Sequence, residues 1–100
     1  MDDATPTGVD GASPTAVVLY TRPGCGLCTE TRDFLTALLA RRAADGRRSA
    51  LLVERDIETD PAWERAYFAE IPVVELGDRR LTLATSPARI ERFVAEVLDR

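Results

Sequence analysis

Residues 16–28 read Ala16-Val17-Val18-Leu19-Tyr20-Thr21-Arg22-Pro23-Gly24-Cys25-Gly26-Leu27-Cys28. The first six form a continuous apolar and β-branched run that ends before Pro and Gly, which predicts a strand buried on both faces. Beyond the loop, apolar residues recur at helical spacing as far as Leu39, so we predict a helix from Cys25 to about Ala44. The two cysteines therefore lie where a buried strand passes into a helix.

Two further elements follow this helix. The apolar run at residues 50–57 predicts a second strand, and the long helix before it allows a right-handed crossover, so we expect this strand to run parallel to the first. Asp60 and Pro61 are typical of an N-cap followed by the first residue of a helix, and they introduce a short helix.

A hairpin and a last helix complete the chain. The apolar stretches 73–76 and 79–83 flank the turn residues Gly77-Asp78, which predicts two antiparallel strands. Ser86-Pro87 then opens a helix with an apolar stripe. Together the elements predict an α/β domain, with three helices packed on a mixed four-stranded sheet.

Composition narrows the class of protein. With 100 residues, 45% of them hydrophobic and 30% charged, the chain has the make-up of one ordinary folded domain. Residues 1–15 hold few bulky apolar side chains, so we expect a disordered tail there and a single domain at 16–100. No apolar run reaches the length of a membrane span and the first residues lack a secretory signal, so we expect a cytoplasmic protein.

Charge and residue types exclude several functions. The formal net charge of −4 argues against a nucleic acid or an anionic membrane as partner and leaves a neutral or cationic partner open. All 13 basic residues are Arg, with no Lys and no His, so no imidazole can act as a base or metal ligand and no Lys can form a Schiff base. Two cysteines are too few for a four-ligand zinc site. We expect no bound metal or cofactor.

The spacing of the cysteines indicates redox chemistry. Within a helix, Cβ atoms three residues apart are about 5–6 Å apart, whereas a disulfide needs about 3.5–4.5 Å, so we place Cys25 at the helix cap. There the free N–H groups and the helix dipole stabilise a thiolate, which makes Cys25 the attacking sulfur. Cys28, one turn further, is expected to be shielded and to resolve a mixed disulfide. Arg22 adds a positive charge nearby that helps to hold the thiolate.

Other interpretations of these residues stay open at this point. Both cysteines could be small buried side chains without reactivity, and Arg22 could be a solvated loop charge. Ile71-Pro72 stands at the start of an apolar strand, where a missing N–H is tolerated, and the pattern alone does not establish a cis bond.

The residues 18–28, together with Ile71-Pro72-Val73 and the hairpin at Gly77, resemble the glutaredoxins, in particular the small bacterial glutaredoxin-like proteins. The resemblance implies a thioredoxin-like fold with sheet order 2-1-3-4 and an antiparallel third strand. It implies that Cys25 is the nucleophile, Cys28 the resolving cysteine and Pro72 a cis-proline packed against the disulfide. The backbone of Ile71 would pair with an extended thiol substrate.

The sequence also departs from typical glutaredoxins. Gly26 and Leu27 stand between the cysteines in place of Pro and an aromatic residue, and residues 83–88 replace the Gly-Gly and Asp that hold glutathione. The start of the last helix, with the hydroxyls of Thr85 and Ser86, could still bind a carboxylate, and Ser86 could equally be only an N-cap. The Arg-rich, Ala-rich composition suggests a high-GC bacterium, in which another low-molecular-weight thiol could replace glutathione.

The leading hypothesis is a monomeric thiol–disulfide oxidoreductase that reduces protein disulfides or mixed disulfides of small thiols. Glutathione, another small thiol or a flavoprotein reductase would return the electrons. One alternative is a redox-inert thioredoxin-fold module that binds a partner through the edge of the third strand or through Trp63, Tyr67 and Phe68. Another is a dimer that carries an iron–sulfur cluster held by Cys25 and a thiol ligand.

Overall fold

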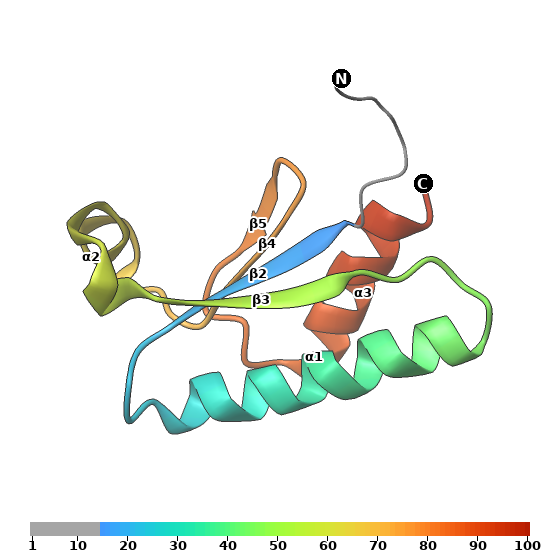
Figure 1. Cartoon of the computed structure of the whole chain (residues 1–100), viewed down its shortest axis with the longest axis horizontal. Helices are drawn as coiled ribbons and strands as arrows, with labels where there is room; N and C mark the ends of the chain where they lie inside the picture. Colours follow the sequence, from blue (N-terminus) through green and yellow to red (C-terminus); the bar gives the residue numbers. More distant parts are fainter. Residues whose placement is uncertain (1–14) are drawn as a thin grey trace, which may run out of the picture.

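The computed structural model describes residues 15–100. The predicted tail at 1–15 lies outside the described residues apart from Thr15, whose carbonyl accepts a hydrogen bond from the Leu51 amide at 2.8 Å. The elements follow in the order β2 (Ala16–Thr21), α1 (Gly26–Ala44), β3 (Leu51–Asp56), the 3-10 helix η1 (Ile57–Thr59), α2 (Pro61–Tyr67), β4 (Val73–Leu76), β5 (Arg79–Leu81) and α3 (Pro87–Leu98) (Figure 1).

The four strands form one mixed sheet in the order β3-β2-β4-β5, which confirms the predicted order 2-1-3-4. β2 and β3 are parallel, and Thr21 at the end of β2 lies opposite Asp56 at the end of β3. β4 is antiparallel to β2, so that Val73 at its start lies opposite Tyr20. The end of β2, the end of β3 and the start of β4 therefore meet at one end of the sheet, where the chain continues to the two cysteines.

One face of the sheet packs against α1 and α3, which lie side by side on it (Figure 1). Leu19 of β2 is fully buried there, and burial of such a side chain contributes about 1.5–3 kcal/mol. Most of the side chains that pack around Leu19 come from the predicted apolar stripes of the two helices. These side chains are Leu35, Leu38 and Leu39 of α1 and Ile90, Phe93, Val94 and Leu98 of α3. This core fixes the position of α1 and so of its N-terminus.

The other face carries a smaller core at the end near α2. The ring of Tyr20 lies 4.4 Å from the ring of Tyr67 and 5.8 Å from that of Trp63, centroid to centroid. Burial raises the pKa of the Tyr20 phenol above its usual value of 10.0. Of the three aromatic residues that the interaction-module hypothesis names, Tyr67 is buried, Trp63 is partly buried against this core, and Phe68 is 61% exposed.

Several local expectations are confirmed, and three are corrected. The second strand ends at Asp56, because the next residue, Ile57, is fully buried in the 3-10 helix η1. The fourth strand ends at Leu81 instead of residue 83, because Leu83 has a φ of 50° and its amide bonds to the Glu70 carbonyl. The third strand, β4, has neighbours on both sides, so it offers no edge to a partner.

Over residues 15–100, none of the helices combines the length and the apolar character that a membrane crossing requires.

Candidate active site

Cys25 is the N-cap of α1, as predicted. Its backbone is extended, with φ −90° and ψ 103°, and its sulfur accepts a hydrogen bond from the Cys28 amide at 3.1 Å. Its carbonyl accepts from both the amide and the hydroxyl of Thr29, at 3.2 and 3.3 Å. These contacts hold the sulfur of Cys25 at the open end of a 19-residue helix, where the helix dipole favours negative charge.

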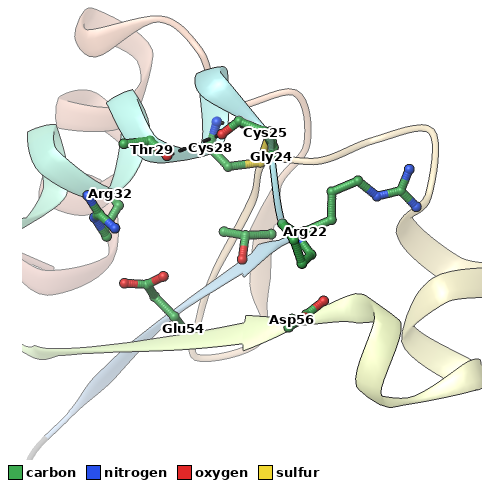
Figure 2. Close-up of a pocket in the computed structure, with 10 residues that line it drawn as sticks. Arg22, Gly24, Cys25, Cys28, Thr29, Arg32, Glu54 and Asp56 are labelled. Atoms are coloured by element: carbon green, nitrogen blue, oxygen red, sulfur yellow. Dashed lines mark hydrogen bonds between the residues drawn. A yellow bond between two sulfur atoms is a disulfide. The ribbon is translucent and has the colours of Figure 1, made fainter.

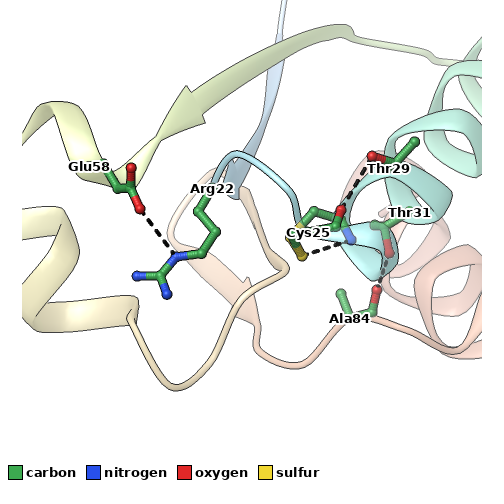
Figure 3. The surroundings of a disulfide bond; sticks show 7 residues. Arg22, Cys25, Thr29, Thr31, Glu58 and Ala84 are labelled. Carbon is green, nitrogen blue, oxygen red and sulfur yellow. Dashed lines mark hydrogen bonds and ion pairs between the residues drawn. A yellow bond between two sulfur atoms is a disulfide. The ribbon is translucent and has the colours of Figure 1, made fainter.

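Cys25 and Cys28 form a disulfide with a Cα–Cα distance of 5.2 Å (Figure 3). Cys28 is 2% exposed, whereas Cys25 is only half-buried. The pair therefore consists of one partly exposed cysteine and one buried cysteine.

The Ile71–Pro72 peptide bond is cis, and Pro72 is buried. The Pro72 carbonyl accepts a hydrogen bond from the Ala84 amide at 2.8 Å, and the Ala84 carbonyl accepts from the hydroxyl of Thr31 at 2.6 Å. Thr31 lies one turn beyond Cys28 on α1, so this chain of hydrogen bonds ties the cis-proline loop to the helix that carries the cysteines (Figure 3).

Arg22 has different partners from those that the sequence predicts. Its guanidinium turns away from Cys25 toward α2 and η1 (Figures 2 and 3), where it lies 3.1 Å from the Glu64 carboxylate and 3.8 Å from that of Glu58. Two carboxylates therefore offset its charge. The buried Nε of Arg22 has no hydrogen-bond partner among the residues that the structure describes.

The remaining predicted residues lie around the same end of the sheet. The amide of Ile71 donates to the Tyr67 carbonyl at 3.2 Å, and no described residue donates a hydrogen bond to the Ile71 carbonyl. Ser86 caps α3 by accepting from the Arg89 amide at 3.3 Å. Thr85 is exposed and shares a small cavity of about 50 Å³ with Leu27, so the start of α3 faces the segment between the cysteines.

The sequence model of one family, described as a glutaredoxin-like domain (DUF836), matches residues 16–98. The chain belongs to this glutaredoxin-like family. No curated protein matches it.

Solved structures of low sequence identity share the fold of this glutaredoxin-like chain. Target protein XcR50 from X. campestris aligns with a TM-score of 0.63 and 23% identity, over 81% of this chain and 97% of its own. Protein Ne2328 from Nitrosomonas europaea aligns with a TM-score of 0.61 and 22% identity, over 86% and 98%. Oxidized mitochondrial thioredoxin 3 from Saccharomyces cerevisiae aligns with a TM-score of 0.61 and 16% identity, over 86% and 81%. The fold is thus thioredoxin-like.

The glutaredoxin-like site includes residues that the sequence analysis did not single out. A cavity of about 280 Å³ opens beside the disulfide, and its walls include Arg32 of α1 and Glu54 and Asp56 of β3 (Figure 2). A signal for the two carboxylates was available, since the ends of parallel strands meet at one end of a sheet and β3 is predicted parallel to β2. No three His, Cys, Asp or Glu side chains gather as metal ligands would in the part of the chain that the structure describes.

Proposed function

We propose that this glutaredoxin-like protein is a thiol–disulfide oxidoreductase in which Cys25 attacks and Cys28 resolves. The observation that carries the proposal is the asymmetry of the pair. Cys25 is half-buried at the N-cap of α1, and Cys28 is buried within bonding distance of it. A low thiolate pKa at the accessible sulfur and a shielded second sulfur are what stepwise disulfide exchange requires.

The reaction proceeds in two exchanges. In the first, the Cys25 thiolate attacks one sulfur of a substrate disulfide, the substrate S–S bond breaks, and one half leaves as a thiolate that takes a proton from solvent. In the second, Cys28 loses its proton and attacks the sulfur of Cys25, which releases the other half as a thiolate and closes the Cys25–Cys28 disulfide. The substrate gains two electrons and the protein loses two.

A reducing partner must then return these two electrons. Two molecules of glutathione, or of another low-molecular-weight thiol, can reduce the Cys25–Cys28 disulfide and are themselves oxidised to one disulfide molecule. A flavoprotein reductase is the alternative electron donor. The proposal places this cycle in the cytoplasm, with the protein acting as a monomer. The free carbonyl of Ile71 beside the cis-proline Pro72 is suited to pair with an extended substrate, and Thr85 and Ser86 at the start of α3 are suited to a carboxylate.

Redox equilibration tests the proposal. The protein is incubated in buffers of graded thiol-to-disulfide ratio, quenched by alkylation and weighed intact by mass spectrometry. We expect one transition between a form with two free thiols and a form with the Cys25–Cys28 disulfide, and a Cys28→Ser variant that forms only mixed disulfides. If the wild-type protein never closes the internal disulfide, the proposed mechanism is wrong. An iron–sulfur role would instead show as colour and bound iron in freshly purified protein.

A further inference from the structure

The cavity beside the disulfide is lined by β3, whereas the loop of Ile71 and Pro72 leads into β4 on the other side of β2. The proposed reaction does not use this cavity. It is bounded by the loop at residues 21–25, by Cys28 and Arg32 of α1, and by Glu54 and Asp56 of β3. Its volume of about 280 Å³ has room for a small substituent on the sulfur that bonds to Cys25. A substituent in this cavity therefore lies close to the charged side chains on its walls.

The cations on the cavity walls have carboxylate partners of their own. Arg22 pairs with Glu64 and Glu58. Arg32 donates from both Nε and a terminal nitrogen to one oxygen of Asp33, at 3.1 and 3.0 Å. Neither guanidinium is left as an uncompensated positive charge for a substrate anion.

Within residues 15–100, the carboxylates on the walls have no such cationic partners. Glu54 forms no ion pair with any residue in 15–100, and its side chain points from β3 into the space below α1 (Figure 2). Asp56 accepts a hydrogen bond from the Glu58 amide at 2.9 Å but has no cationic partner among the described residues. The register of the sheet places Glu54 opposite Leu19 and Asp56 opposite Thr21, so both carboxylates lie on the face that α1 covers.

We propose that Glu54 and Asp56 determine the substrate specificity of this site. They favour disulfides that carry an ammonium or guanidinium group near the sulfur over disulfides that carry carboxylates. The inference rests on the proposed oxidoreductase function and adds a substrate class to it. The attraction acts on the substituent that remains on Cys25 in the mixed disulfide, so it raises the rate of the first exchange. Because both carboxylates are reached by solvent, the effect is a modest factor that salt weakens.

The test compares three small disulfides of different charge, which are cystamine, hydroxyethyl disulfide and dithiodiglycolate. Second-order rate constants for their reduction by the reduced protein are measured at neutral pH. Each is divided by the rate constant for β-mercaptoethanol under the same conditions, which removes the intrinsic reactivity of the disulfide. We expect the corrected ratio of cystamine to dithiodiglycolate to be about tenfold at low salt. At about 1 M salt, where the Debye length is about 3 Å, it should approach one.

Variants identify the source of this selectivity. Glu54→Gln should lower the corrected ratio by about threefold, and the pair Glu54→Gln and Asp56→Asn should lower it further. Asp78→Asn is the control, because Asp78 lies in the hairpin turn at the far end of the sheet and is 91% exposed. It removes the same charge and should leave the ratio unchanged. Circular dichroism confirms that each variant is folded.

The outcomes separate this inference from the proposed function. If all three disulfides are reduced but the corrected ratio is near one, or if Glu54→Gln alone and the double variant both leave it unchanged, the specificity inference is wrong and the oxidoreductase function stands. If the protein reduces none of the three, the proposed function fails and the specificity inference fails with it.

Discussion

The amide nitrogen of Cys28 lies 3.1 Å from the sulfur of Cys25. This contact directs an N–H of the first turn of α1 at the sulfur of the less buried cysteine. In the reduced protein the same N–H can stabilise a thiolate at Cys25, whereas Cys28 is buried and no residue in 15–100 donates a hydrogen bond to its sulfur. The two sulfurs are therefore expected to differ in reactivity although only two residues separate them.

Single-cysteine variants test this difference. Cys28→Ser should react once with a substrate disulfide and stop as a stable mixed disulfide on Cys25, because the resolving thiol is missing. Cys25→Ser should form at least tenfold less adduct in the same time, since Cys28 is 2% exposed. Both variants are incubated with cell extract, and mass spectrometry measures the adduct that each forms. The adducts of Cys28→Ser also identify the substrates. Equal adduct formation by the two variants would contradict the assignment of roles. A partner that stays bound to a variant lacking both cysteines would favour the interaction-module hypothesis.

Substitutions at Arg22 and Glu64 test whether the guanidinium stabilises the Cys25 thiolate. Because Arg22 is paired with Glu64 at 3.1 Å, Arg22→Gln should raise the pKa of Cys25 by well under about one unit. Glu64→Gln should lower that pKa slightly, because it removes one of the two carboxylates that offset the guanidinium charge. The double-mutant cycle for unfolding should give a coupling of about 0.5 kcal/mol. A rise of about one unit or more in the Cys25 pKa for Arg22→Gln would restore the role that the sequence suggests.

The protein should be more stable with glycine than with alanine at position 83. Its φ of 50° lies in the left-handed region, which costs a residue with a Cβ about 1–2 kcal/mol, and its side chain is 53% exposed, so truncation loses little packing. We expect Leu83→Gly to exceed Leu83→Ala in unfolding free energy by about 0.5–1 kcal/mol, measured by urea titration. At Ala37, an exposed position within α1, substitution by glycine should instead cost about 1 kcal/mol. Equal stability of the two Leu83 variants would mean that the backbone relaxes there.

Asp99 should make stability depend on pH in the acid range. A hydrogen bond from the buried Arg42 lowers the pKa of the Asp99 carboxyl below its usual value of 3.8. The folded state therefore binds fewer protons than the unfolded state, and the stabilisation that is present at neutral pH is lost as the pH falls through that range. Asp99→Asn should lower the melting temperature at neutral pH, with a smaller difference from wild type in acid. Asp78→Asn should show no such convergence, and a constant difference for Asp99→Asn would contradict the account.

Local signals in the sequence predicted most of the fold. The apolar run of β2, the capping residues Asp60 and Ser86 and the turn at Gly77 each act within a few residues, and the structure confirms the element that each predicts. The early end of β5 could not be predicted in this way. It depends on hydrogen bonds that the Leu83 and Ala84 amides make to carbonyls more than ten residues earlier in the chain.

The sequence predicted the positions of the two cysteines in the candidate site, but it did not predict how the charged side chains around them are arranged. The cap position of Cys25 follows from helix geometry alone. The partners of Arg22 come from α2 and η1, and their position depends on how these two helices pack, which no pattern near Arg22 specifies. Glu54 and Asp56 look like ordinary polar residues of a strand. Their place beside the disulfide emerges only from the parallel register with β2.

Activation of Cys25 by the N-terminus of α1 is tested most directly by the ultraviolet thiolate absorbance of the fully reduced protein, followed as a function of pH. We expect one thiol to titrate well below about 8.5, the pKa of a free cysteine. The Cys28→Ser variant should keep this titration, and the Cys25→Ser variant should lose it. If both thiols titrate at or above that value, the N-terminus of α1 does not activate Cys25, and the proposed mechanism is contradicted.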